Sequence, residues 1–245
     1  MIEIEDFNNL VRTERQKLFR TPYDIVYDSF EKLEYNKKSS KDFETDASLM
    51  LENLRAECWD IFSKEEKLFT TKMLKEIIKY NQEIQNMNGL EAISEFVEHY
   101  PEHIYSLSLS NTQSRRSRAG KEFEAIIELL LMGADISIDS QGNIGKDLFI
   151  KKGLGKIVDL VSPGIIEYTL IKTRAVLISA KTSLRERWQE VPEEMARTGA
   201  SKMYLVTLDT TISESVLKIL YESNIIIVVT RNIKENHYPY NNNVI

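Results

Sequence analysis

The sequence predicts an α/β protein: a mixed β-sheet flanked by helices, with a helical N-terminal subdomain in front of it. Two observations support this prediction. Up to about residue 100, apolar residues recur at the three- and four-residue spacing of amphipathic helices. From about residue 118, short runs rich in β-branched residues alternate with turns and further helices. We therefore expect a helical subdomain at residues 1–100 and a sheet-containing core at residues 101–245.

The N-terminal part is expected to consist of helices joined by short connections. Three stretches show helical spacing of their apolar residues: 46–62, 67–84 and 86–101. Pro101 is expected to close the last of them. The polar stretch 34–44 is expected to be a loop between two helices.

The C-terminal part begins with a strongly apolar helix at 119–134 that ends at Gly133. Strands are then expected in five runs: 135–139, 156–162, 175–183, 202–209 and 225–230. Two amphipathic helices, 184–197 and 212–223, separate the last three runs. The runs "AVLISA" and "IIIVV" are apolar throughout, which indicates central strands covered by helices on both faces. The tail after residue 230 has no periodicity, and no element is assigned to it.

Composition limits the class of protein. The 245 residues are 42% hydrophobic, enough for a sizeable core, and carry a net charge of -6. An acidic balance argues against a protein that coats nucleic acid through bulk charge. A site-specific nucleic-acid protein whose positive charge is confined to one cleft remains open.

Cysteine and histidine usage excludes several kinds of site. Cys58 is the single cysteine, so an intramolecular disulfide or a cysteine-based zinc cage is not possible. The three histidines include no pair at helical metal-ligand spacing: His99, His103 and His237. The sequence shows neither a signal-peptide pattern nor a run of roughly 20 apolar residues. We therefore expect a cytoplasmic protein without a membrane segment.

Four charged residues of the C-terminal part form a candidate catalytic set. Asp159 lies in the apolar run "GKIVDLVSP", and Lys181 ends the run "LISAK". Glu194 lies on the helix that follows, and Glu124 lies on the earlier apolar helix. Burying a lone charge costs several kcal/mol or shifts its pKa. Two charged residues at strand ends in one sheet are therefore expected to face each other or to share a cation.

The chemistry that uses such a set is metal-assisted phosphodiester hydrolysis. Carboxylates hold Mg²⁺, which polarises the phosphate and helps to deprotonate the attacking water. A lysine adds a fixed positive charge near the transition state. Taken singly, each residue also has an ordinary explanation. Asp159 could be a turn former at a strand end, and Lys181 could be a strand-end lysine whose ammonium lies in solvent. Glu124 and Glu194 could be solvated residues on the surface of helices. Their order along the chain favours the catalytic interpretation.

The segments "IVDLVSP" and "ISAKTSLRERW" resemble the restriction-endonuclease branch of the PD-(D/E)XK nucleases. More narrowly, they resemble the EcoRII/SsoII/PspGI type, which cuts at CCGG-like cores and has a restriction-endonuclease-like mixed sheet. Ser179 stands where the superfamily usually has an acid, and in this branch the acid is moved to the following helix. The resemblance implies Mg²⁺ binding by Asp159 and Glu194, assistance to the attacking water by Lys181, and an acidic cluster completed by Glu124.

The residues after Lys181 are candidates for base recognition. A helix is expected to begin near Thr182 or Ser183, either of which can cap it, and its first turn presents Arg185 and Glu186. Arginine pairs with guanine O6 and N7 in the major groove, and a carboxylate accepts from cytosine N4. The same pair also fits an ordinary exposed helix pair. The resemblance, sharpest over 113–194, implies that Arg185 contacts guanines and Glu186 cytosines.

A basic run lies upstream. Residues 110–124 contain four basic residues and no acid before Glu122: Arg115, Arg116, Arg118 and Lys121. Such a run in front of a helix N-terminus suits phosphate binding, although a solubilising loop has the same composition. The resemblance implies that Gln113 contacts the outer base pair.

Arg55 and Trp59 are four residues apart and thus on one helical face. Trp59 alone fits a core residue. In the resembled branch, enzymes of the CCNGG and CCWGG type flip the central nucleotides into a pocket made by an N-terminal aromatic and an arginine. Stacking on an aromatic ring offsets part of the unstacking cost of a few kcal/mol.

The leading hypothesis is a homodimeric, Mg²⁺-dependent type II restriction endonuclease that cuts double-stranded DNA at a palindromic CCNGG- or CCWGG-like site. Two-fold symmetry would match the palindrome, and the N-terminal helices are expected to carry DNA contacts, the base pocket and part of the dimer interface. The resemblance also implies a companion DNA methyltransferase. Two alternatives stay open: a nuclease for structured or damaged DNA, and a catalytically silent DNA-binding module, against which the intact set of four residues argues.

Overall fold

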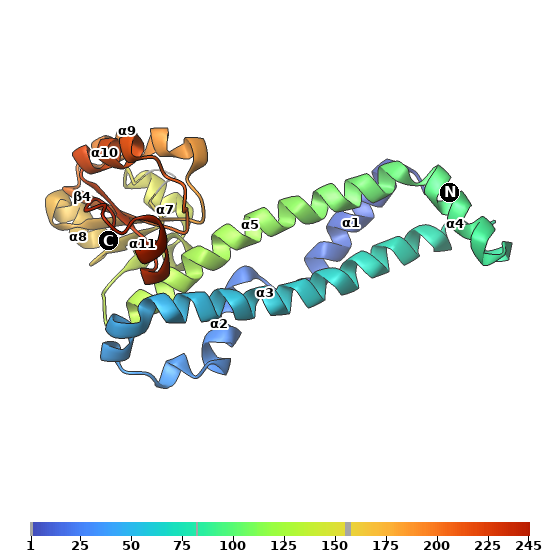
Figure 1. Cartoon of the computed structure of the whole chain (residues 1–245), viewed down its shortest axis with the longest axis horizontal. Helices are drawn as coiled ribbons and strands as arrows, with labels where there is room; N and C mark the ends of the chain where they lie inside the picture. The colour runs from blue at the N-terminus through green and yellow to red at the C-terminus, as the bar shows by residue number, and fades with distance from the viewer. Residues whose placement is uncertain (1, 82, 155–157) are drawn as a thin grey trace.

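Two long helices set the shape of the molecule, whose computed structural model describes residues 2–81, 83–154 and 158–245. They are α3, Ser40–Lys79, and α5, Pro101–Gly133. The two helices pack on each other and run out from the sheet as an arm (Figure 1). At a rise of about 1.5 Å per residue, the 40-residue α3 is about 60 Å long.

Both long helices begin at residues suited to a helix start. The Ser39 hydroxyl accepts a hydrogen bond from the Asp42 N–H, and the Asp42 carboxylate accepts from the Ser39 N–H. Pro101 lies in the first turn of α5, where a missing N–H costs no helical hydrogen bond. Pro101 also follows the C-cap of α4, Gly89–His99, so the expectation that a helix ends at Pro101 is confirmed, and the same residue begins the next helix.

The helices expected at 46–62 and 67–84 are one helix. No glycine or proline occurs between Ser40 and Lys79, so nothing interrupts the backbone hydrogen bonds across the charged stretch between the two apolar patterns. In the same way, the basic residues before position 119 lie inside α5. In both places the charged residues fit a loop, but charged side chains are equally stable on the solvent-facing side of a long helix.

Four short helices complete the arm: α1 (Ile4–Leu18), α2 (Pro22–Lys32), η1 (Tyr35–Lys37) and η2 (Ile84–Asn86). The loop expected at 34–44 is thus only partly present, because η1 and the first turn of α3 occupy most of it. Phe7, Phe69, Met73 and Tyr100 are at most 1% exposed and give the arm its own apolar core.

The sheet has five strands in the order β1-β2-β3-β4-β5. Their bounds are Asp139–Ser140, Leu160–Ser162, Val176–Lys181, Lys202–Thr207 and Ile225–Val228. The first two pairings are antiparallel, and β3, β4 and β5 are parallel. The predicted mixed sheet is therefore confirmed. Of the run expected at 156–162, residues 156 and 157 lie outside the described ranges.

Helices cover both faces of β3, whereas β5, expected to be a central strand, is the edge strand of the sheet. On one face, Leu177, Leu205 and Ile227 belong to a core shared with helices α8, α9 and α10. On the other, Ile178 and Ala180 of β3 belong to a core shared with α3 and α5. The apolar character of β3 on both faces, which the sequence predicts, follows from this layering.

The helices of the C-terminal part are α6 (Gln141–Ile144), α7 (Lys146–Lys151), α8 (Ile165–Leu170), η3 (Lys172–Arg174), η4 (Arg185–Gln189), α9 (Glu190–Thr198), α10 (Glu214–Glu222) and α11 (Arg231–His237). The helix expected at 184–197 is divided into η4 and α9, and α11 lies in the tail to which no element was assigned. In the described ranges, no helix combines the length and apolarity that crossing a membrane requires.

Candidate active site

Asp159 and Lys181 meet where β2 begins and β3 ends. Asp159 lies one residue before β2, and its backbone N–H donates to the Ile178 carbonyl at 2.9 Å. Its Oδ2 accepts from the Lys181 Nζ at 2.7 Å, the Ala180 N–H at 2.7 Å and the Ser179 hydroxyl at 3.4 Å. The structure thus brings these two predicted residues into one ion pair.

The ion pair is largely removed from water. The side chains of Asp159 and Lys181 are 7% and 16% exposed. Burial raises the pKa of Asp159, whereas the charge of Lys181 and the hydrogen bonds from Lys181, Ala180 and Ser179 act in the opposite direction. The lysine therefore stabilises a carboxylate that the protein interior would otherwise protonate.

Glu124 of α5 lies in electrostatic contact with this pair. Burial and the negative charge of Asp159 raise the pKa of Glu124 to about 7, against opposing effects of Lys181, Lys121 and Lys146. Glu124 and Asp159 line one cavity of about 450 Å³. Two carboxylates that repel each other in a polar cavity form an anionic centre beside the Lys181 ammonium.

The donor set suits a hard divalent cation. Oxygen ligands from carboxylates are what Mg²⁺ takes, and a bound cation would relieve the repulsion that raises the pKa of Glu124. Among the residues that the structure describes, no three of His, Cys, Asp and Glu are grouped as a ready metal site. Glu194 lies half-buried on α9 and is not among the residues lining this cavity.

The recognition candidates follow β3 directly. Arg185 begins η4 in a left-handed conformation, with φ 44°, and is exposed together with Glu186. The predicted cap at Thr182 or Ser183 is wrong, because Leu184 precedes η4 and no side chain caps it. Such a conformation costs a non-glycine residue roughly 1 kcal/mol and indicates that the surroundings hold it.

Asp209, which sequence reasoning missed, holds the start of η4. Its carboxylate accepts from the buried Leu184 N–H at 3.0 Å. Partial burial acts to raise the pKa of Asp209, yet hydrogen bonds from Leu184, Thr211 and Arg185 keep it below its usual range. The only sequence signal was an acid two residues after the end of β4 and before "TT", which is typical of a side chain that binds nearby backbone N–H groups.

The basic run does not precede a helix N-terminus, because α5 extends through it. Arg115 forms a bidentate ion pair with the buried Glu66. Arg118 is largely buried between helices and donates to the Arg20 carbonyl at 2.9 Å. Arg116 and Gln113 are exposed on α5. Two of the predicted phosphate contacts are therefore engaged in holding the arm together.

Arg55 and Trp59 are both exposed on α3, and Trp59 is 54% exposed. The alternative that Trp59 is a core residue is therefore wrong. Its ring lies 6.0 Å from that of Phe62, and the Arg115 guanidinium lies 5.8 Å from its centroid. An indole held on one side and accessible on the other can stack on a further ring.

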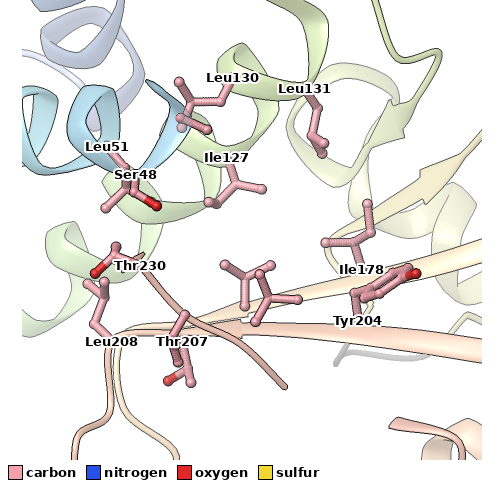
Figure 2. A pocket seen from close by; sticks show the side chains of 14 residues that line it. Ser48, Leu51, Ile127, Leu130, Leu131, Ile178, Tyr204, Thr207, Leu208 and Thr230 are labelled. Carbon is pink, nitrogen blue, oxygen red and sulfur yellow. The ribbon is translucent and has the colours of Figure 1, made fainter. Parts of the chain in front are cut away.

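A second cavity, of about 250 Å³, lies between α3, α5 and the sheet (Figure 2). No charged side chain lines it. The hydroxyls of Ser48 and Thr230, which Figure 2 shows at its edge, already accept from the Arg231 and Ile233 N–H groups. A phosphodiester would lose its hydration there without gaining a partner, so the polar cavity at Asp159 is the candidate active site.

Comparisons with known proteins identify relatives of this chain. The EcoRII C terminal family model matches residues 69–244. The type II restriction enzyme SsoII of Shigella sonnei is 51% identical over 240 residues, 98% of this chain and 78% of that protein. A solved structure of metal-depleted Ecl18kI in complex with uncleaved DNA matches with TM-score 0.91 and 48% identity, over 100% of this chain and 81% of that chain. A PspGI-substrate DNA complex matches in fold, with TM-score 0.59 and 16% identity, over 86% and 77% of the two chains.

Proposed function

The chain belongs to the EcoRII C terminal family, and from that membership we propose that it is a type II restriction enzyme, a site-specific deoxyribonuclease. The resemblance to the EcoRII/SsoII/PspGI type and the restriction-endonuclease-like fold are confirmed. The observation that supports the activity most directly is the Asp159–Lys181 ion pair beside Glu124 in one polar cavity.

The residues of this cavity fit phosphodiester hydrolysis. Asp159 and Glu124 present the oxygen donors that would hold Mg²⁺, and Glu194, from the resemblance, would add a third. When bound, the cation supplies polarisation of the phosphate and a more acidic water. Lys181, fixed by its 2.7 Å contact with Asp159, places a positive charge where negative charge develops on the phosphate.

Sequence specificity is proposed to come from residues next to this cavity. Arg185 follows Lys181 by four residues, so one strand-turn unit carries both the lysine of the active site and the proposed guanine contact. Glu186 would accept from cytosine and Gln113 would contact the outer base pair. A correctly recognised site would then position the phosphate at the carboxylates.

The exposed pair Arg55 and Trp59 is proposed to receive a flipped central nucleotide, which implies a CCNGG- or CCWGG-like palindrome rather than uninterrupted CCGG. The exposure of Trp59 supports this, since a stacked base would cover apolar surface that is now open. Arg116, exposed on α5, is available for a phosphate.

A palindromic site implies two copies of the chain on double-stranded DNA. We propose a homodimer in which residues 1–100 contribute DNA contacts, the base pocket and dimerisation, and residues 101–245 form the nuclease core. Activity in the cytoplasm requires a companion DNA methyltransferase, because unprotected host DNA would be cut. The Ecl18kI and PspGI structures are complexes with DNA, which supports the DNA partner.

Plasmid cleavage tests this function. Wild-type protein should linearise plasmid carrying the site in Mg²⁺ and leave it intact in EDTA, and Lys181→Ala should leave it intact in both. Lys202→Ala is the matched control, because Lys202 is exposed and lies at the opposite end of the neighbouring strand β4. Cleavage by the Lys181 variant at the wild-type rate would contradict the assignment.

A further inference from the structure

The cavity at Asp159 contains more charge than the proposed chemistry uses. Its lining includes two lysines, Lys121 of α5 and Lys146 at the start of α7, besides Glu124, Glu128 and Asp159. Both lysines act electrostatically on Glu124. They reach the cavity from two different helices, so the anionic centre has a cation on each of two walls.

These two cations are exposed and available. Neither ammonium group forms a hydrogen bond or an ion pair within the part of the chain that the structure describes, whereas Lys181 is held by Asp159. Lys146 stands directly after Gly145, whose φ of 92° turns the chain into α7. The position of Lys146 is thus set by a turn that glycine adopts without strain.

A DNA strand needs such cations at this place. Every phosphate that approaches the cavity meets three carboxylates, on a chain with a net charge of -6. Of the three arginines upstream on α5, Arg115 and Arg118 are engaged within the arm, which leaves only Arg116 exposed and available. Lysine binds phosphate as a compact point charge on a flexible stem, which tolerates a backbone that must slide into position.

We propose that Lys146 and Lys121 bind phosphates of the cleaved strand on the two walls of this cavity and so position the scissile phosphate at the carboxylates. The inference rests on the proposed function and extends it to Lys146, for which no role was predicted, and to a defined place on the cavity wall for Lys121 of the basic run. The ligand is the DNA backbone, so the contacts carry no sequence information.

Salt dependence of DNA binding tests the proposal. The probe is a duplex carrying a CCNGG site, in EDTA, between about 50 and 200 mM salt. In the proposed homodimer each substitution removes two phosphate contacts per complex, so Lys146→Gln and Lys121→Gln should each reduce the slope of log K against log salt by about 1.8, and the double variant by about 3.6. Because the contribution of two contacts scales as salt to the power of about -1.8, each single variant should bind about 60-fold more weakly at ~0.1 M salt.

Two further variants separate phosphate binding from a structural effect. Lys146→Arg retains the charge and should restore the slope. Lys151→Gln changes an exposed lysine at the other end of α7, outside the cavity lining, and should leave slope and affinity at wild-type values. Unchanged slopes for Lys146→Gln and Lys121→Gln, with wild-type protein bound normally, overturn this inference alone. Wild-type protein that binds no duplex overturns the proposed function and this inference together.

Discussion

Glu124→Gln should stabilise the metal-free protein at pH 8. In the folded protein, burial and the charge of Asp159 raise the pKa of Glu124 to about 7 from 4.5. The two values differ by about 2.5, and about 1.4 kcal/mol per pKa unit gives an upper bound of about 3.5 kcal/mol. Glu124 is partly exposed, so solvent screening reduces this to about 1–2 kcal/mol.

The sign follows from proton linkage. The folded state binds the proton more tightly than the unfolded state, so the contribution of Glu124 to stability is fully present below pH 4.5 and is lost as pH rises through about 7. The advantage of the glutamine variant should therefore be full at pH 8, small at pH 5 and absent below pH 4.5. Mg²⁺ should reverse the order, because it stabilises only the protein that retains the carboxylate.

Thermal unfolding in EDTA at several pH values measures this difference. For a domain of this size, about 1–2 kcal/mol corresponds to a rise in Tm of roughly 2–8 °C at pH 8. Glu98→Gln is the control, because Glu98 is exposed on α4 and should change Tm little at any pH. A variant that is less stable than wild type at pH 8, or equally stable, would refute the raised pKa of Glu124 that burial and the charge of Asp159 together produce.

Three further substitutions test other parts of the account. Lys181→Ala should lower the free energy of unfolding at pH 8 by about 3 kcal/mol in urea titrations, because the buried Asp159 carboxylate loses its counter-charge; a loss under 1 kcal/mol would argue against the ion pair. Asp209→Ala should cost about 1–3 kcal/mol and reduce kcat/KM on the cognate site, since the buried Leu184 N–H loses its acceptor and η4 loosens; unchanged cleavage would remove its positioning role. Trp59→Ala should leave Tm within about 2 °C, because the ring is 54% exposed. The variant should nevertheless abolish the rise in fluorescence that 2-aminopurine, placed at the central position of the site, shows when the base is flipped. A retained rise would exclude the proposed pocket.

Local signals in the sequence predict the parallel part of the fold well. The run that became β3 is apolar, and its burial on both faces by helices agrees with that composition. The run "IIIVV" became β5, which is the edge strand of the sheet and not the central strand that its composition indicated. Helix boundaries in the arm were predicted poorly. Polar residues separate two apolar patterns before Lys67. From the sequence alone, such polar residues fit a loop between two helices as well as the solvent-facing side of one continuous helix, and the structure has one helix there. Proline likewise fits a helix start as well as a helix end, and Pro101 both follows the end of α4 and begins α5.

The candidate site could be predicted where adjacent residues carry the signal. Asp159 and Lys181 stand out because charges in apolar strands need partners, and the structure pairs them at 2.7 Å. Lys146 and Asp209 gave no such signal. Lys146 begins the short helix α7 and Asp209 lies in the loop after β4, and tertiary packing sets their places beside the cavity and η4. The resemblance supplied the roles of Glu194 and Glu186, and both remain proposals.

The central claim is metal-dependent cleavage at one palindrome, and sequencing all new DNA ends tests it most directly. Genomic and plasmid DNA would be incubated with the protein in Mg²⁺ and in EDTA, with Lys181→Ala in parallel. We expect ends in Mg²⁺ alone, lost in the variant, that share a CC…GG palindrome. Ends scattered without a common sequence, or confined to junctions and nicks, would contradict site-specific recognition by Arg185 and Glu186.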